Sequence, residues 1–159
     1  MAFELKSPAF KANERIPKKH TGEGEDVSPA LTWSGAPKGT KSFALIMDDP
    51  DAPVGLWLHW VLFDIPAAAS RLPEGVAKKD ALPDGSKQGE CWGTEKMGYE
   101  RAGYFGPLPP PGKPHRYFFK LYALDNVLGL PPKAAKTDLL KAMHGHILAQ
   151  AELVGIYER

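Results

Sequence analysis

Three segments of the chain are apolar at almost every position, and each predicts a buried strand. They are Lys41–Met47 (KSFALIM), Trp57–Ile65 (WLHWVLFDI) and His115–Leu124 (HRYFFKLYAL). Strands that are covered on both faces have this nearly continuous hydrophobic pattern. Shorter strands are expected near Phe3–Leu5 and Ala30–Trp33, whereas residues 66–114 contain no strong periodic segment. Strict alternation along the second long strand would place one set of side chains on a single face: Trp57, His59, Val61, Phe63 and Ile65.

Apolar positions at helical spacing occur convincingly only once, late in the sequence. Thr137 is a suitable N-cap, and the spacing predicts a helix whose apolar stripe consists of Leu140, Met143, Ile147 and Ala151. Gly145 would lie inside that helix, where glycine costs about 1 kcal/mol relative to alanine. Leu153–Tyr157 then predicts a last strand. The pattern indicates one mainly β domain over residues 1–159, with two packed antiparallel sheets, a C-terminal α-helix and long loops.

Composition narrows the classes of function. Hydrophobic residues make up 43% of the chain and charged residues 25%, with a net charge of +1, so we expect no nucleic-acid partner. Cys91 is the only cysteine, which leaves no intrachain disulfide and favours a structural or incidental thiol. The first ten residues lack the apolar core of a signal peptide, and no apolar run is long enough for a transmembrane helix. These observations predict a cytoplasmic protein.

Polar side chains gather where the predicted strands begin and end. Asp49 and Asp51 directly follow the first long strand. His59 lies near the beginning of the second strand, and His115 and Tyr117 lie at the beginning of the third. In antiparallel neighbours these positions meet at one edge of the sheet. A turn is satisfied by one aspartate, a glycine and a proline, so the additional carboxylates are expected to face the histidines.

Such a pocket has a specific chemistry. A carboxylate beside an imidazole raises the pKa of the imidazole and fixes its tautomer. Two histidines kept partly protonated, together with the Tyr117 hydroxyl, would donate charge-assisted hydrogen bonds to phosphate or carboxylate. We therefore expect Asp49 to lie within hydrogen-bonding distance of His59 or His115. Arg116 alternates with His115 and should point away from the pocket and pair with an acid, for which the candidates are Asp51, Asp64 and Asp125.

Five stretches carry a resemblance to a known family: Ser28–Trp33 (SPALTW), Lys41–Pro53 (KSFALIMDDPDAP), Trp57–Pro66 (WLHWVLFDIP), Gly103–Pro111 (GYFGPLPPP) and Pro114–Asp125 (PHRYFFKLYALD). They resemble the phosphatidylethanolamine-binding protein family, in its bacterial and archaeal Raf-kinase-inhibitor-like branch. DPDAP followed at this distance by HRY is a specific combination. The resemblance covers nearly the whole chain and implies a β-sandwich with a small anion pocket at one end.

The resemblance also implies a ligand and site residues. The ligand would be phosphate, acetate or a phosphorylated head group such as phosphoethanolamine. The ligand-binding residues would be Asp49, Asp51, His59, His115 and Tyr117. Pro53, Gly106 and Pro110 would form the pocket wall, with Trp57 on the face of His59. The Ala52–Pro53 bond would be cis.

Relatives of this kind act as inhibitors or modulators of kinases or serine proteases, which implies a kinase or protease partner; a homodimer is left open. This chain departs from the resemblance in three places. Leu108 and Gly22 stand where many prokaryotic members have cysteines, which leaves a redox role of that loop unsupported. The segment between Pro53 and Trp57 is short and predicts a more open pocket rim, and the insert Thr94–Arg101 (TEKMGYER) is atypical.

We therefore expect a non-enzymatic binding protein without a cofactor or metal. The alternative is a small metal- or acid–base-dependent hydrolase, because two histidines with a carboxylate can bind a metal and Asp, His and Tyr can exchange protons. A scaffold with a vestigial pocket is the third hypothesis. Against an enzyme, the chain has no HExxH, GxSxG or Walker motif. His144 and His146 would point about 200° apart on the predicted helix and could not share a metal.

Overall fold

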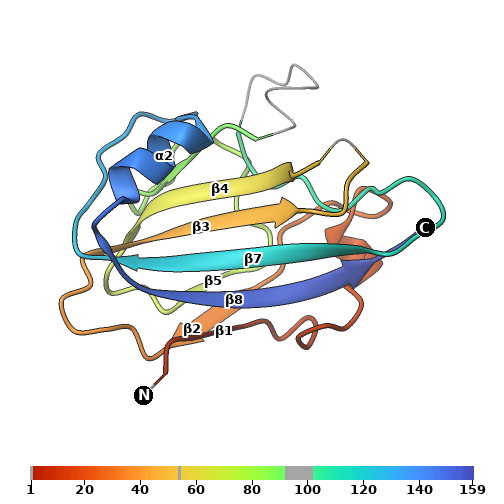
Figure 1. Ribbon diagram of the computed structural model, residues 1–159, viewed down its shortest axis with the longest axis horizontal. Coiled ribbons are helices and arrows are strands. Elements are labelled where there is room, and N and C mark those ends of the chain that lie inside the picture. The colour runs from red at the N-terminus through yellow and green to blue at the C-terminus, as the bar shows by residue number, and fades with distance from the viewer. Residues whose placement is uncertain (1, 54, 92–101) are drawn as a thin grey trace.

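Two antiparallel sheets pack against each other in the computed structural model, which describes residues 2–53, 55–91 and 102–159 (Figure 1). The smaller sheet has the order β1-β2-β5, formed by β1 (Glu4–Lys6), β2 (Leu31–Ser34) and β5 (Arg71–Leu72). The larger sheet has the order β6-β4-β3-β7-β8. Its strands are β3 (Ser42–Asp49), β4 (Trp57–Pro66), β6 (Lys87–Gln88), β7 (His115–Leu124) and β8 (Ile147–Tyr157). The mainly β fold class with two antiparallel sheets is confirmed.

The three apolar segments form the centre of the larger sheet. β3 lies between β4 and β7 and is buried along its whole length. One face of this sheet packs on the smaller sheet through a core that includes Trp33, Phe43, Trp60 and Phe119. The other face packs against the helix α2 (Lys136–Met143). Burial on both faces explains why the sequence of these strands does not alternate between apolar and polar residues.

The predicted helix is much shorter in the structure than its apolar stripe. It ends at Met143, and Gly145 has a φ of +81° in the turn that follows. The residue that caps the helix is Ala135, so Thr137 lies inside it, and the buried side chains are Leu139 and Met143. β8 then begins at Ile147 rather than Leu153. The prediction of this boundary is wrong because a glycine in the left-handed region ends helices readily, and the apolar spacing continued by coincidence into a strand.

Two β-bulges change which side chains of β4 share a face. Leu58 is opposite Asp48 and Trp60 is opposite Met47, so His59 is an additional residue in β4. A second irregularity lies between Leu62 and Ile65, where Asp64 has a φ of +55°. The predicted alternation is therefore wrong: Val61 and Phe63 pack in the helix-side core, whereas Trp60, Leu62 and Ile65 pack between the sheets. Bulges re-aim side chains in this way.

The end of β3 and the beginning of β7 lie at the opposite end of the larger sheet from helix α2 (Figure 1). β3 ends and β7 begins at the right-hand end in this view, while α2 covers the left-hand end. A 3-10 helix, η1 (Lys18–His20), precedes β2. Among the described residues there is no cis peptide bond, so the predicted cis Ala52–Pro53 bond is wrong. None of the helices in the described ranges combines the length and the apolar character needed to cross a bilayer.

Candidate functional site

A cavity of about 430 Å³ opens at the end of the larger sheet where β3 stops and β4 and β7 start. The pairing of Asp49 with Trp57 and of Asp48 with Phe118 brings these three strand ends together. This confirms the expected antiparallel arrangement. The lining residues are Asp49, Ala52, Pro53, Trp57, His59, Leu108, Pro109, Pro110, His115 and Tyr117.

Asp49 and His115 form a buried hydrogen-bonded pair on the cavity wall. Nδ1 of His115 lies 2.7 Å from Oδ2 of Asp49, and their side chains are only 8% and 3% exposed. The other oxygen of Asp49 accepts the backbone N–H of Asp51 at 2.7 Å. The prediction that Asp49 bonds to a pocket histidine is confirmed. Because Nδ1 of His115 is committed to the carboxylate, Nε2 is the nitrogen with which His115 can meet a ligand.

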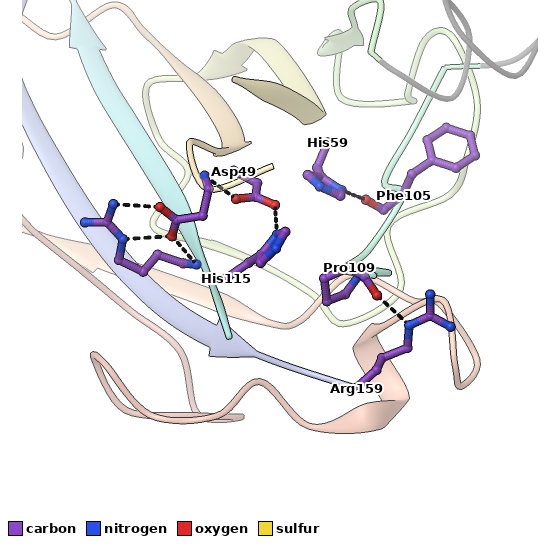
Figure 2. A network of polar contacts seen from close by, with 8 residues as sticks. Asp49, His59, Phe105, Pro109, His115 and Arg159 are labelled. Carbon is purple, nitrogen blue, oxygen red and sulfur yellow. Dashed lines mark hydrogen bonds and ion pairs between the residues drawn. The ribbon is translucent and has the colours of Figure 1, made fainter. Parts of the chain in front are cut away.

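His59 occupies the bulge of β4 and bonds to the loop opposite. Its Nδ1 lies 2.5 Å from the carbonyl oxygen of Phe105 (Figure 2). The backbone N–H of Phe105 donates to the carbonyl of His59 at 3.2 Å. Burial lowers the pKa of His59 to about 4; the bond to Phe105 opposes this shift and the charge of His115 adds to it. His59 is therefore neutral near pH 7, and the prediction that both histidines are partly protonated is wrong.

Tyr117 lies between the two histidines. Its ring makes an edge contact with His59 at 5.3 Å between centroids and stacks near His115 at 6.5 Å. Burial, followed by the negative charge of Asp49, raises the pKa of the Tyr117 hydroxyl. The phenol consequently keeps its proton across the neutral range and can donate a hydrogen bond.

Asp51 is engaged elsewhere, with Arg116. The guanidinium of Arg116 donates two hydrogen bonds of 2.9 Å to the two carboxylate oxygens, and its backbone N–H donates a third. The hydrogen bonds from Arg116 lower the pKa of Asp51 to about 2. The prediction that Arg116 pairs with an acid is confirmed. The expectation that Asp51 faces the histidines is wrong, because residue 116 points to the opposite face of β7 and takes Asp51 with it.

The opposite wall of the cavity is the proline-rich segment 105–112, named here the wall loop. Its backbone is bonded to distant residues: Gly106 N–H donates to Asp26 Oδ1 at 2.7 Å, and Arg159 Nε donates to the Pro109 carbonyl at 2.5 Å (Figure 2). A Cβ at Gly106 would lie 2.2 Å from the carbonyl oxygen of His20, so only glycine allows this approach. Gly106 is thus a support for the wall and does not itself line the cavity, in contrast to the prediction.

Sequence reasoning missed several parts of this wall. Leu108 and Pro109 line the cavity and lie in the loop that the resemblance already marked. Asp26 and Arg159 had no local signal, since they act only through contacts that are distant in sequence. A Cβ at Gly22 would touch Leu108 at 3.1 Å, so the two positions that replace the expected cysteines are neighbours.

Three further predictions from the sequence can be compared with the structure. Cys91 is fully buried, and its thiol lies 3.6 Å from the Gly103 carbonyl, as a structural thiol would. His144 and His146 lie in the turn after α2 rather than on it, and His146 bonds to Asp125 at 2.7 Å. The described residues contain no cluster of three or more His, Cys, Asp or Glu that could hold a metal. The insert 94–101 and residue 54 of the pocket rim lie outside the described residues.

Comparison with known proteins matches nearly the whole chain to one protein family. The model of the family described as phosphatidylethanolamine-binding protein matches residues 6–158. A UPF0098 protein of Methanothermobacter thermautotrophicus is 52% identical over 158 residues, 99% of each chain. In the crystal structure of E. coli YbcL, described as a new member of the mammalian PEBP family, the TM-score is 0.88 at 37% identity, with 100% of this chain and 99% of that chain covered. A phosphatidylethanolamine-binding protein homologue from Chlamydia trachomatis, CT736, has a TM-score of 0.87 at 40% identity, over 99% and 98% of the two chains.

Proposed function

The chain belongs to the phosphatidylethanolamine-binding protein family, and we propose that its cavity is a non-catalytic binding site for a small oxyanion. The ligand would be phosphate or a phosphorylated head group such as phosphoethanolamine. The observation that carries this proposal is the buried pair of Asp49 and His115 on the cavity wall, 2.7 Å apart. Asp49 compensates the charge of a protonated His115, so this imidazolium can be present in a buried site and still donate from Nε2 to an incoming anion.

The neighbouring groups support an oxyanion ligand. The Tyr117 hydroxyl keeps its proton and adds a neutral donor from the same strand. The proline and aliphatic walls, including Pro53 and Leu108, exclude water and strengthen these hydrogen bonds. The prolines also leave little chain entropy to lose on binding.

The same lining argues against the hydrolase alternative. None of the described residues that line the cavity is a serine, threonine or cysteine, so this part of the wall offers no aliphatic hydroxyl or thiol as a nucleophile. Tyr117, with its raised pKa, is a poor general base. We therefore propose a binding role, with a kinase or serine-protease partner as a prediction from the resemblance and a cytoplasmic location as a prediction from the sequence.

Isothermal titration calorimetry with phosphoethanolamine tests the proposal, and Trp57 on the cavity wall gives a second, fluorescence signal. His115→Ala should cost on the order of 1.5–3 kcal/mol of binding free energy, because a charge-assisted bond is lost. Tyr117→Phe should cost on the order of 1 kcal/mol, since it removes a neutral donor. Asp51→Asn is the matched control: Asp51 bonds to Arg116 away from the cavity, so this variant should bind within about twofold of the parent.

Three results would count against the proposal. Failure of phosphoethanolamine and inorganic phosphate to bind at millimolar concentration would leave the vestigial pocket as the better hypothesis. Equal losses in the Asp51 and His115 variants would mean that the cavity does not contain the binding site. Zinc binding that is detected by the same calorimetry and abolished by His115→Ala would favour the metal-dependent alternative.

A further inference from the structure

A backbone carbonyl determines which nitrogen of the His59 ring is a hydrogen-bond donor and which is an acceptor. Nδ1 of His59 lies 2.5 Å from the Phe105 carbonyl oxygen, and a carbonyl can only accept. Nδ1 therefore carries the hydrogen. In a neutral imidazole the second nitrogen is then an acceptor. His59 lines the cavity and so presents to it a ring whose Nε2 accepts rather than donates.

The groups around His59 keep it in this state near neutral pH. Its side chain is almost completely buried, and burial holds its pKa near 4. Among the described residues, the other titratable groups that line the cavity are Asp49 on β3 and His115 and Tyr117 on β7. The carboxylate of Asp49 is already bonded to His115 and to the Asp51 backbone, as Figure 2 shows for His115. Asp49, the carboxylate among the described lining residues, is thus hydrogen-bonded to the other imidazole ring.

An acceptor in an oxyanion site distinguishes ligands by their protons. A fully deprotonated oxyanion has only lone pairs and would place one of them against Nε2 of His59. A phosphate that retains one proton has a P–OH group that can donate there, while its other oxygens accept from His115 and Tyr117. A buried polar group left facing the wrong partner is costly, which is why sites of this kind discriminate strongly.

We propose that the cavity selects oxyanions that carry a proton, such as monoanionic phosphate or a monoanionic phosphate monoester, and that Nε2 of His59 accepts that proton's hydrogen bond. This specificity rests on the proposed oxyanion-binding function and adds the ionisation state of the ligand to it. His59 is the residue that determines the preference, whereas His115 supplies the affinity for negative charge.

Calorimetry of inorganic phosphate and sulfate between pH 5.5 and 8.5, at constant ionic strength, tests the proposal. The two ions have the same tetrahedral shape, but sulfate has no proton in this range. Phosphate should bind at least about tenfold more tightly than sulfate at pH 5.5, as expected for one unmatched buried hydrogen bond. The preference should persist at pH 8.5, because phosphate that has lost its second proton still carries one P–OH group, whereas sulfate has the same charge there and no proton. Sulfate alone reports any pH dependence of the protein itself, so the ratio of the two affinities isolates the proton of the ligand.

His59→Asn is the matched variant. Its side-chain amide can donate to the Phe105 carbonyl from near the position of Nδ1 but has no counterpart of Nε2. The preference for phosphate at pH 5.5 should shrink to within about threefold in this variant. Should the variant fail to fold, the phosphate-to-sulfate ratio of the unaltered protein still decides.

The outcomes separate the two proposals. Equal affinities for phosphate and sulfate at pH 5.5, or an undiminished preference in a folded His59→Asn protein, would overturn the role of His59 and leave oxyanion binding intact. Absence of binding by both ions would overturn the proposed function and this inference with it.

Discussion

Acid should destabilise this protein through His59 before it protonates most carboxylates. The pKa of His59 is about 4 in the folded chain, compared with about 6.5 for an unperturbed histidine in the unfolded chain. Between these two values the unfolded chain binds a proton that the folded chain does not bind. The contribution to stability is therefore fully present above pH 6.5 and is lost as the pH falls towards 4.

The size of the effect follows from the same two values. Each factor of ten in proton affinity corresponds to about 1.4 kcal/mol, so the full loss at pH 4 is about 3 kcal/mol, of which about 2 kcal/mol is already lost at pH 5. This is a large fraction of the 5–15 kcal/mol that is typical of a folded domain. The pair of Asp51 and Arg116 does not interfere: the pKa of Asp51 is lowered from 3.8 to about 2, so its contribution is present above 3.8 and is lost only in more acidic solution.

Urea denaturation at pH 7, 6 and 5 measures the effect, followed by Trp fluorescence. The control is His59→Asn, which keeps a donor for the Phe105 carbonyl and has no titrating ring. The unaltered protein should lose about 2 kcal/mol more than the variant between pH 7 and 5, whatever the variant costs at pH 7. The remaining histidines contribute equally to both proteins. Parallel losses in the two proteins would refute the reasoning, since they would mean that folded His59 accepts a proton as easily as the unfolded chain does.

Three further substitutions test the supports of the fold and site. Asp64→Ala should lower the free energy of unfolding by about 2–4 kcal/mol, measured by thermal denaturation, because this buried carboxylate accepts two backbone N–H groups and pairs with Lys87. A change below about 0.5 kcal/mol would contradict it. Gly106→Ala should lower the melting temperature and weaken phosphoethanolamine binding, because the new methyl group would collide with the His20 carbonyl 2.2 Å away; unchanged binding would show that the wall loop can shift freely. Arg116→Leu should leave phosphate affinity within about twofold by calorimetry, because its guanidinium is bonded to Asp51 outside the cavity; a tenfold loss would place Arg116 in the site.

The central strands and the general position of the site follow from local sequence properties. β3, β4 and β7 are apolar runs long enough to span the sheet, and their antiparallel order brings Asp49, His59 and His115 together whatever the loops do. The predicted bond between Asp49 and His115 needed only this order and the type of each residue. Such features are predictable because strand geometry repeats every two residues.

The features that sequence missed depend on single extra residues or on distant contacts. One additional residue in β4 turns His59 towards Tyr117, and no local pattern marks that bulge. The apolar spacing beyond α2 continued through Gly145, whose backbone angle ends the helix. Asp51 was named both as a pocket residue and as a candidate partner of Arg116, because the turn after β3 could have directed it to either face of β7; the structure shows the pairing with Arg116. In each case the local energy difference is small and tertiary packing decides.

The wall loop has a consequence for when the cavity can exist during folding. Its backbone is bonded to Gly22 and Asp26, to His59, and to Arg159, which lie in three widely separated parts of the sequence. A partly folded chain that lacks any of these segments has no complete cavity. A ligand of this cavity should therefore bind the finished protein alone and, at a hundredfold excess over its Kd, stabilise it by about 2.7 kcal/mol. An assay that measures how phosphoethanolamine protects the chain from a protease would therefore report only the molecules that have folded completely.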